Sequence, residues 1–338
     1  MGSMKEESIT MAHGFGGVAY HELVEEIFVP AFANDMLAPL GDAAVCKLTG
    51  DRLAFTTDSF VVQPRFFPGG DIGRLAVCGT VNDLAMSGAK PLYLSCGMIM
   101  QAGFSLSELK RIVASMAAAA GEAGVAIVTG DTKVVEQGSC DGIYINTAGV
   151  GMFEHEPLAV CPKAGDVIMV SGLLAAHGLA VLAARQSLDF EPPLKSDAAP
   201  LNGLAQSLLK AVPQLSCLRD PTRGGLAATL YEWAIASHST IIIEEAALPL
   251  SKPVSAACAL LGLDPLYIAN EGVMAAALPS AQAEIALAAL RRQPLGAKAA
   301  IIGRVGKALP QTPLILHTAA GGKRRIDLPQ GDLLPRIC

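Results

Sequence analysis

Four aspartates lie just after apolar runs or at helix positions that face a core, where α/β-type sites collect their polar groups. They are Asp42, Asp58, Asp83 and Asp131. If they converge, each close pair of carboxylates repels by about 4 kcal/mol at moderate dielectric, so the cluster needs cations. Mg²⁺ takes carboxylate oxygens and keeps phosphate oxygens and water as its other ligands. The set predicts a magnesium–nucleotide site, although any one aspartate alone is more often a turn or cap residue.

Further charged groups could complete such a site. Lys133 follows two residues after Asp131, so on an extended segment the two side chains point the same way. It could bind a phosphate, or act as a base if it is desolvated, and otherwise it is an ordinary surface lysine. The run 220–225 places a carboxylate, a guanidinium and two glycines before a helix, which suits an anion but also an ordinary cap and turn. The candidate binding residues of this run are Asp220, Thr222 and Arg223. Glu271, in an Asn-Glu-Gly run, either adds one more carboxylate to the site or belongs to an ordinary turn.

The chain ends in a cysteine, Cys338, which no residue follows. Chain ends are poorly ordered unless they are tied down, and an exposed thiol is open to reaction. Eight extended residues reach roughly 26 Å, which is enough to move a thiol between two sites. This cysteine is therefore either a stray thiol or the carrier of a covalent group on a mobile tail.

Two common phosphate-binding motifs are absent from the sequence. It contains no G-x-x-x-x-G-K-[ST], which excludes a P-loop, and no G-x-G-x-x-G. The run 13–17, His-Gly-Phe-Gly-Gly, resembles a phosphate-binding loop only weakly, so we expect a flexible N-terminal segment there. Its backbone amides could still fold over an anion.

Composition restricts the class of protein. A length of 338 residues favours two domains, and a hydrophobic share of 51% allows large cores. The net charge of −6 argues against nucleic-acid binding. The eight cysteines have no metal-ligand spacing and lie mostly in apolar runs, so we expect core residues in a reducing cytosol. The sequence has no secretory signal and no apolar run of membrane-spanning length, which predicts a cytoplasmic protein without membrane contact.

The candidate residues need strands and helices to bring them together, and the apolar pattern predicts both. Expected strands are 53–57, 91–100, 125–129, 143–153, 167–170, 240–243, 266–269, 301–305 and 314–317. Expected helices follow Asp71 and Ser105, where Ser-x-x-Glu forms a capping box, and further helices are expected at 177–184, 226–236 and 280–292. A polar break at 154–163 separates two α+β halves. We expect a flexible N-terminal segment with a first helix at 1–40, domains at 41–155 and 162–325, and a mobile tail at 326–338.

The chain resembles the ATP-binding superfamily that includes aminoimidazole ribonucleotide synthetase, selenophosphate synthetase and thiamine-monophosphate kinase. The resemblance rests on the runs Gly-Asp-Ala-Ala-Val, Thr-Thr-Asp-Ser-Phe, Val-Asn-Asp-Leu-Ala-Met-Ser-Gly-Ala, Thr-Gly-Asp-Thr-Lys, Asp-Pro-Thr-Arg-Gly-Gly-Leu and Asn-Glu-Gly, in this order. The terminal Pro-Arg-Ile-Cys narrows it to the HypE family of hydrogenase maturation factors. The resemblance extends from His13 to Cys338, but the usual paired acids near the first run are reduced to the single Asp42.

The resemblance implies an α+β fold of two aminoimidazole ribonucleotide synthetase-like domains. It further implies N-terminal domains that pair in a homodimer and a flexible C-terminal tail. ATP and Mg²⁺ would bind where acids from several elements meet, often across the dimer interface. The implied cofactor-binding residues are Asp42, Asp58, Asn82, Asp83, Asp131, Asp220, Thr222 and Arg223, with Asp42, Asp58, Asp83 and Asp131 as metal ligands.

By the same resemblance, the activity is an ATP-dependent dehydration. The carbamoyltransferase HypF would place a carbamoyl group on the Cys338 sulfur, and the enzyme would convert this thiocarboxamide to a thiocyanate. The cyano group would pass to iron on the HypC–HypD complex and become a ligand of [NiFe]-hydrogenase. Lys133 and Glu271 are the candidate bases for the nitrogen protons. Two alternatives stay open: a non-enzymatic carrier that displays Cys338, and a sister phosphorylating enzyme, against which the lack of a cysteine at 13–17 counts.

Overall fold

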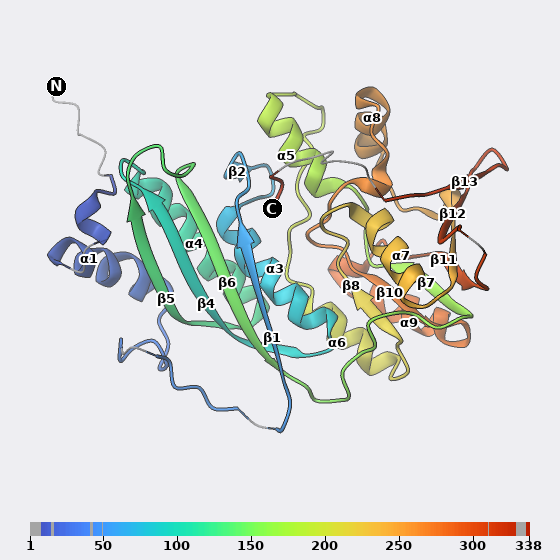
Figure 1. Cartoon of the computed structure of the whole chain (residues 1–338), viewed down its shortest axis with the longest axis horizontal. Helices are drawn as coiled ribbons and strands as arrows, with labels where there is room; N and C mark the ends of the chain where they lie inside the picture. Colours follow the sequence, from blue (N-terminus) through green and yellow to red (C-terminus); the bar gives the residue numbers. More distant parts are fainter. Residues whose placement is uncertain (1–7, 15–16, 41–42, 49, 310, 329–335) are drawn as a thin grey trace.

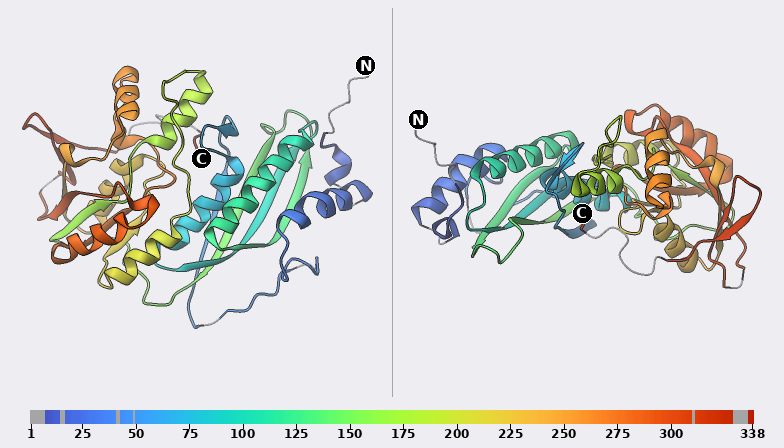
Figure 2. Two further views of the ribbon diagram at one scale, coloured as in Figure 1. Left: turned by 180° about the vertical axis from the view of Figure 1, so that it is seen from behind. Right: turned by 90° about the horizontal axis from the view of Figure 1, so that it is seen from above.

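A computed structural model describes residues 8–14, 17–40, 43–48, 50–309, 311–328 and 336–338. Of the three sheets in the described residues, the two large ones lie side by side, each with helices packed against it (Figure 1), and the third is a two-stranded pair. The first sheet is formed by residues up to Met152 and the second by residues from Asp166 onward. The expected α+β fold with two sheet-and-helix units is confirmed. The C-terminus returns to the junction between the units, near β2 (Phe66–Phe67) and α5 (Ala176–Gln186) (Figures 1 and 2).

The first sheet has the strand order β1-β6-β4-β5. Its strands are β1 (Leu53–Phe60), β4 (Lys90–Gln101), β5 (Ala126–Val135) and β6 (Ile143–Met152). Only β4 and β5 are parallel; the other neighbours are antiparallel. Helices α3 (Ile72–Met86) and α4 (Leu106–Ala123) cover one face of this sheet (Figures 1 and 2). No helix of the described residues covers the other face, which we call the open face.

The two covering helices begin at the residues that the sequence predicts. Asp71 caps α3, because its Oδ1 accepts a hydrogen bond from the N–H of Arg74 at 2.9 Å. Ser105 caps α4, because its Oγ accepts from the N–H of Glu108 at 3.4 Å. Gly124 ends α4 in the left-handed region, with a φ of 68°.

A helical arm precedes the first sheet. It consists of η1 (Met11–Gly14), α1 (Val18–Leu23), the π-helical η2 (Val24–Phe28) and α2 (Val29–Ala31). The arm lies beside α4 and β5 (Figure 1). Its side chains Leu23 and Ile27 are buried in the main core, so the arm is part of the folded unit.

The second sheet has the strand order β13-β12-β9-β11-β7-β10-β8. Its strands are β7 (Asp166–Val170), β8 (Cys217–Arg219), β9 (Thr240–Glu244), β10 (Ala275–Pro279), β11 (Ala300–Gly306), β12 (Leu314–His317) and β13 (Lys323–Arg325). Helices α5, α6 (Asn202–Ala211), α7 (Gly225–Ala236), α8 (Lys252–Leu261) and α9 (Ala283–Arg291) surround it. Short elements are β3 (Gly70–Asp71), η3 (Glu245–Ala247), η4 (Pro265–Tyr267), η5 (Ser280–Gln282) and η6 (Pro294–Gly296).

Helix α3 joins the two units through buried hydrogen bonds. Asn82 is fully buried, and its Nδ2 donates to the backbone oxygens of Ala199 at 3.2 Å and Glu271 at 3.3 Å. Its Oδ1 accepts from the N–H of Leu201 at 2.7 Å. Because a buried amide must be hydrogen-bonded, these contacts fix the second unit against α3.

Three sequence-based expectations are wrong. Residues 266–269 form no strand; η4 occupies this place, because Asp264 Oδ1 accepts from the N–H of Leu266 at 3.0 Å and holds a turn. Strands β1 and β5 are longer than expected, so Asp58 and Asp131 lie within strands and not after them. Helices α6 and α8 and strand β10 had no expected counterpart; β10 is largely alanine and is buried at all but its last residue, so it shows no alternation of apolar and polar residues.

The eight cysteines all lie in the described residues and form no disulfide among them, and most are buried. Across the described segments of the chain, every helix is too short or too polar to cross a membrane.

Candidate active site

The helix-covered face of the first sheet holds Asp58 and Asp83. Asp58 pairs with Thr147 of β6, and the Thr147 hydroxyl donates to the backbone oxygen of Ala76 in α3 at 2.8 Å. Paired residues share a face of a sheet, so Asp58 faces α3. Asp83 of α3 accepts a hydrogen bond at 2.9 Å from Thr56, which lies on the same face of β1. The two carboxylates therefore meet where β1 lies against α3.

Both carboxylates carry negative charge that the protein only partly compensates. Partial burial raises the pKa of Asp58, against a hydrogen bond from the N–H of Ser59 and the positive charge of Arg223. Partial burial also raises the pKa of Asp83, and the charge of Asp58 adds to this rise. Carboxylates in this state favour a bound cation.

The second unit contributes two further acids, Asp220 and Glu271, which are 9% and 2% exposed. Burial raises the pKa of Asp220 to about 7, and the charge of Asp83 adds to it. Burial raises the pKa of Glu271 well above its ordinary value, and the charges of Asp220 and Asp58 add to it. Because these four side chains act on one another, we call Asp58, Asp83, Asp220 and Glu271 the acidic cluster.

Hydrogen bonds to the backbone hold the two acidic loops of the second unit. The Asn270 Nδ2 and N–H both donate to the backbone oxygen of Pro221, at 3.0 and 3.1 Å. The Asp197 carboxylate accepts from the N–H groups of Glu271 and Gly272, at 3.2 Å each. The loop of Glu271 is thus fixed to the loop of Asp220 and to the segment before α6.

The turn before α7 depends on glycine. Gly224 and Gly225 have φ values of 73° and 62°. A Cβ on Gly225 would lie 2.6 Å from the backbone oxygen of Leu266, so no larger residue fits without a shift. The turn can therefore bring the backbone close to η4 and leave the start of α7 near the acidic cluster.

Thr222 and Arg223 lie in this turn. The N–H of Thr222 donates to the backbone oxygen of Asp220 at 3.0 Å. Arg223 is exposed, and its charge opposes the rise in the pKa of Asp58. A hydroxyl and a guanidinium beside carboxylates suit a phosphate that is held together with a cation.

Asp131 and Lys133 lie on the open face of the sheet, away from the acidic cluster. Asp131 pairs with Gly97 of β4, and Gly97 pairs with Asn146 of β6. Asn146 is one residue out of phase with Thr147, so Asp131 faces the opposite side from Asp58. The Lys133 Nζ donates to both oxygens of Asp131, at 2.6 and 2.5 Å, and both side chains are exposed.

The structure therefore brings only some of the predicted residues together. One site is surrounded by Asp58, Asp83, Asp220, Thr222, Arg223 and Glu271. Asn82 fixes the backbone next to this site through the hydrogen bonds described above. The two candidate bases, Lys133 and Glu271, lie on opposite sides of the first sheet. Asp42 lies outside the described residues.

The donor types of the acidic cluster fit Mg²⁺, but the cluster alone is an incomplete site. Within the described residues, no three His, Cys, Asp or Glu side chains are grouped closely enough to hold a metal ion. Mg²⁺ is commonly bound by one or two carboxylates together with phosphate oxygens and water. A nucleotide or a second chain would have to supply the remaining ligands.

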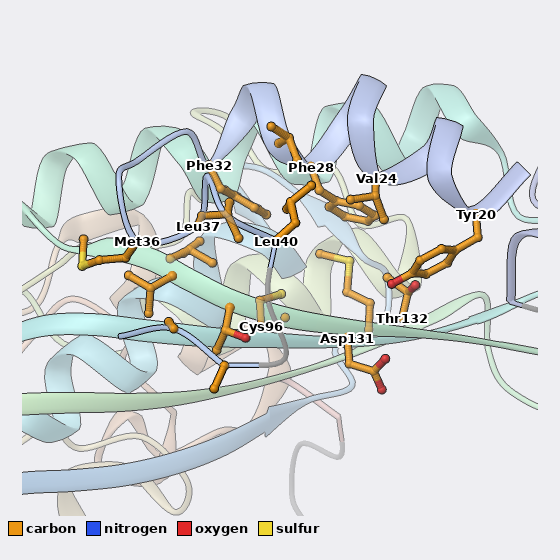
Figure 3. A pocket seen from close by; sticks show the side chains of 18 of the residues that line it. Tyr20, Val24, Phe28, Phe32, Met36, Leu37, Leu40, Cys96, Asp131 and Thr132 are labelled. Carbon is orange, nitrogen blue, oxygen red and sulfur yellow. The ribbon is translucent and has the colours of Figure 1, made fainter. Parts of the chain in front are cut away.

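A cavity of about 240 Å³ lies between the helical arm and strands β4 and β5 (Figure 3). Val24, Phe28 and Phe32 point into it from the arm, and Asp131 and Thr132 line it from β5 (Figure 3). Within the described part of the chain, the buried Thr132 hydroxyl has no hydrogen-bond partner. The Asp131 carboxylate points away from the arm, so the cavity offers an apolar wall and the Thr132 hydroxyl, which suit an aromatic ring with a polar edge.

The last three residues are docked against the segment that follows β1. The N–H of Val61 donates to the backbone oxygen of Cys338 at 3.2 Å, and the N–H of Gln63 donates to that of Arg336 at 3.1 Å. Ile337 is 6% exposed and belongs to the main core. Cys338 therefore lies beside Val61, which follows Asp58 by three residues.

Sequence reasoning missed the residues that support the site through the backbone. Asp197 holds the loop of Glu271, and His177 and Arg185 contact the docked tail. Their sequence signals are weak, because each acts on a segment that lies far away along the chain. Only the tertiary fold brings them into contact.

Two family descriptions match the two halves of the chain. They are AIR synthase related protein, N-terminal domain, over residues 40–153, and AIR synthase related protein, C-terminal domain, over residues 163–309. Thiamine monophosphate kinase from Aquifex aeolicus has the same fold, with a TM-score of 0.59 at 19% identity over 80% of this chain and 89% of that chain.

Full-length relatives narrow the family. Carbamoyl dehydratase HypE of Cupriavidus necator is 49% identical over 99% of this chain and 96% of its own length, and that of Escherichia coli is 48% identical over 98% and 99%. A crystal structure of hydrogenase maturation protein HypE in complex with ATP has a TM-score of 0.94 at 47% identity, covering 97% of this chain and 99% of that one. The chain belongs to the AIR synthase related family and, within it, to the HypE proteins, which confirms the resemblance drawn from its motifs.

Proposed function

We propose that the chain catalyses the ATP-dependent dehydration of a carbamoyl group carried on Cys338. The observation that carries this proposal is the docked terminus, which places Cys338 beside Val61, three residues after Asp58 of the acidic cluster. Relatives at nearly half identity are named carbamoyl dehydratase, and a similar HypE structure contains ATP. A carrier thiol beside a site suited to metal and phosphate fits such an enzyme.

In the proposed reaction, the oxygen of the S-carbamoyl group attacks the γ-phosphorus of ATP and ADP leaves. The oxygen then departs as phosphate and the nitrogen loses both protons, which leaves a thiocyanate on the sulfur. ATP ends as ADP and phosphate, and no oxidant or reductant is required. The protein must orient the carbamoyl group, stabilise the transferred phosphoryl group and accept protons from the nitrogen.

Glu271 is the candidate base on the helix-covered side of the first sheet. Its raised pKa makes it a stronger proton acceptor than an ordinary carboxylate. The bond from its N–H to Asp197 fixes the loop that carries it. Lys133 is the second candidate base, or a phosphate ligand, and it can reach the same reaction only from another copy of the chain.

Asp58 and Asp83 are the proposed Mg²⁺ ligands in the described part of the site, with Asp42 and Asp131 as the further predicted ligands. When bound, Mg²⁺ would neutralise charge on the phosphate oxygens of ATP. Asp220, Thr222 and Arg223 would bind the nucleotide from the second unit. Burial raises the pKa values of Asp58, Asp83 and Asp220, and acidic neighbours add to the rise at Asp83 and Asp220, so a bound cation would favour their charged forms.

The open face of the first sheet is the proposed dimer interface. Phe55 is 68% exposed and Ile99 is 43% exposed on this face, which also carries Asp131 and Lys133. Pairing two such faces would bury apolar side chains and give each site residues from both copies. This arrangement would explain why one chain holds Lys133 and Glu271 on opposite sides of its sheet.

HypF and the HypC–HypD complex are the proposed partners, in the cytoplasm. A crystal structure described as a HypE–HypF complex is similar to this chain, with a TM-score of 0.80 at 46% identity over 91% of this chain and 99% of that one. In the proposed cycle, Cys338 leaves its docked position to receive the carbamoyl group from HypF. It returns for dehydration and then passes the cyano group to HypC–HypD.

Intact-mass spectrometry tests the proposed function. The protein is incubated with HypF, carbamoyl phosphate and Mg-ATP, and the C-terminal peptide is followed over time. A carbamoyl-sized gain that is followed by loss of one water supports both the carrier and the dehydratase. A stable carbamoyl adduct without water loss would leave a carrier only, and a Cys338→Ala variant that still gains the group would remove the carrier role.

A further inference from the structure

We propose that His177 and Arg185 are positioning residues that hold the Cys338 tail in its docked state and align it with the loop of Glu271. This inference rests on the proposed function, because that function requires the Cys338 thiol to be docked near the acidic cluster. The observations that carry it are hydrogen bonds from α5 to the carbonyl groups of Arg336 and Ile337.

Arg185 bridges the tail and the segment after β1. Its Nε donates to the backbone oxygen of Gln63 at 2.7 Å, and its Nη2 donates to the backbone oxygen of Arg336 at 2.7 Å. These two carbonyl groups belong to two segments of the polypeptide that pair in antiparallel orientation. A planar guanidinium that bonds both segments fixes their spacing, because its donors have a rigid geometry.

His177 binds the next residue of the tail. Its Nε2 lies 2.7 Å from the backbone oxygen of Ile337. A carbonyl oxygen only accepts, so the proton is on Nε2, and Nδ1 accepts from the Ser196 hydroxyl at 2.8 Å. The Ser196 Oγ in turn accepts from the N–H of Ala198 at 3.1 Å. The surrounding hydrogen bonds thus give the imidazole a single orientation.

The neutral form of His177 fits this arrangement. Burial lowers the pKa of His177 to about 4, although the bond to Ile337 opposes the change. The imidazole also packs against the ring of Phe67 in a T-shaped arrangement, with centroids 5.5 Å apart. The side chain therefore presents one N–H donor to the tail.

The same segment also holds the loop of the candidate base. Ser196, which orients His177, is followed directly by Asp197, whose carboxylate accepts from the N–H of Glu271. Tail docking and the position of Glu271 consequently depend on two neighbouring residues. A group carried on Cys338 is in this way positioned relative to the loop of Glu271, the residue proposed to accept its protons.

The docked tail needs such contacts because its own conformation is unfavourable. Arg336 has a φ of 54°, which lies in a region of backbone conformation that residues other than glycine rarely adopt. Its guanidinium bonds the backbone oxygen of Val61 at 3.0 Å and pairs with Asp141 at 2.5 Å. Because both partners lie on the body of the protein, the strained residue is held only while the tail is docked.

Digestion by carboxypeptidase Y measures the undocked fraction of the tail, because the protease must extend the terminal residues into its own site. Loss of Cys338 from the full-length protein is followed by intact mass. His177→Phe removes the bond to Ile337 and Arg185→Met removes the bond to Arg336, so we expect release about 2- to 10-fold faster than in the unmodified protein. His177→Gln, which keeps a donor at the same place, should digest closer to the unmodified rate.

Arg291→Met is the matched control, because Arg291 also bonds a backbone carbonyl, that of Ala299, but does so away from the tail. It should leave digestion unchanged. Wild-type digestion rates in both His177→Phe and Arg185→Met would overturn the proposal, as would equal acceleration in Arg291→Met. Thermal unfolding of each variant separates loss of docking from loss of the fold.

A second readout separates positioning from a merely structural role. With HypF present, both variants should accept the carbamoyl group on Cys338 at least as fast as the unmodified protein, and lose water more slowly. Equal slowing of both steps would contradict positioning. The digestion assay needs neither ATP nor a carbamoyl group, so its failure is distinguishable from a failure of the proposed dehydratase activity.

Discussion

At the scale of single residues, the buried carboxylates of the acidic cluster lower the stability of the folded protein when no cation is bound. Asp220 and Glu271 are buried carboxylates whose pKa values are raised by burial and by their acidic neighbours. Among the described side chains, the cationic Arg223 and Arg219 only partly offset this charge at Asp83. A cation bound together with a phosphate group would relieve the repulsion, so the cost in stability is linked to binding.

Asp220→Asn should stabilise the ligand-free protein at pH 8. The folded-state pKa of about 7 lies above the ordinary value of 3.8, so the folded protein binds a proton that the unfolded chain releases. Stability therefore falls as the pH rises from about 4 to about 7, and the whole penalty is present above pH 7. Removing it should gain on the order of 2–4 kcal/mol at pH 8 and much less near pH 4.

Urea unfolding in EDTA at pH 8 and pH 5 checks the Asp220 prediction. Asp51→Asn is the control, because the Asp51 side chain is 96% exposed and should show no such dependence. A variant that loses more stability at pH 8 than at pH 5 would contradict the sign of the effect.

Asp83→Asn should weaken binding of Mg-ATP by about tenfold or more, because one charged ligand or neighbour of the cation is lost. The amide can still accept the hydrogen bond from Thr56, so the fold should be retained. Titration calorimetry with Mg-ATP measures the change. An unchanged dissociation constant would remove Asp83 from the site.

At the scale of elements, the site depends on how strands and helices begin and pair. The starts of α3 and α4 could be predicted from Asp71 and Ser105, because a cap acts within one turn. The face on which Asp131 lies could not be predicted, because it depends on pairing with strands distant in sequence. The same limit hid Asp197, whose bonds to the loop of Glu271 cross more than 70 residues.

Gly225→Ala tests the turn that begins α7. Its φ of 62° and the 2.6 Å approach of a Cβ to the backbone oxygen of Leu266 should together cost about 3 kcal/mol or more. Gly262 has a similar φ of 67°, but no atom of the described residues lies within 4 Å of the place that a Cβ would take, so Gly262→Ala should cost only about 1 kcal/mol. Urea unfolding compares the two variants, and equal losses would show that the close approach to η4 is unimportant.

At the scale of the whole molecule, the proposed pairing of open faces would account for both the separated acids and the exposed apolar side chains of the first sheet. In the proposed homodimer, Phe55→Glu should place a charge in the interface, so the variant should sediment as a monomer where the unmodified chain sediments as a dimer. Leu260→Glu is the control, because Leu260 is 76% exposed on α8, outside the first sheet. A Phe55→Glu protein that remains dimeric would place the interface elsewhere.

Mixing two inactive variants tests whether each site takes residues from both copies. If Lys133 of one chain acts with Glu271 of the other, a mixed dimer of Lys133→Ala and Glu271→Gln chains contains one site with both residues intact and one with neither. Random exchange makes half of all dimers mixed, so about a quarter of the sites should regain dehydration of the carbamoyl group. If both residues of a site came from the same chain, every site in the mixture would lack one of them. The rate of water loss, measured by mass spectrometry before and after subunit exchange, would then stay at the level of the separate variants.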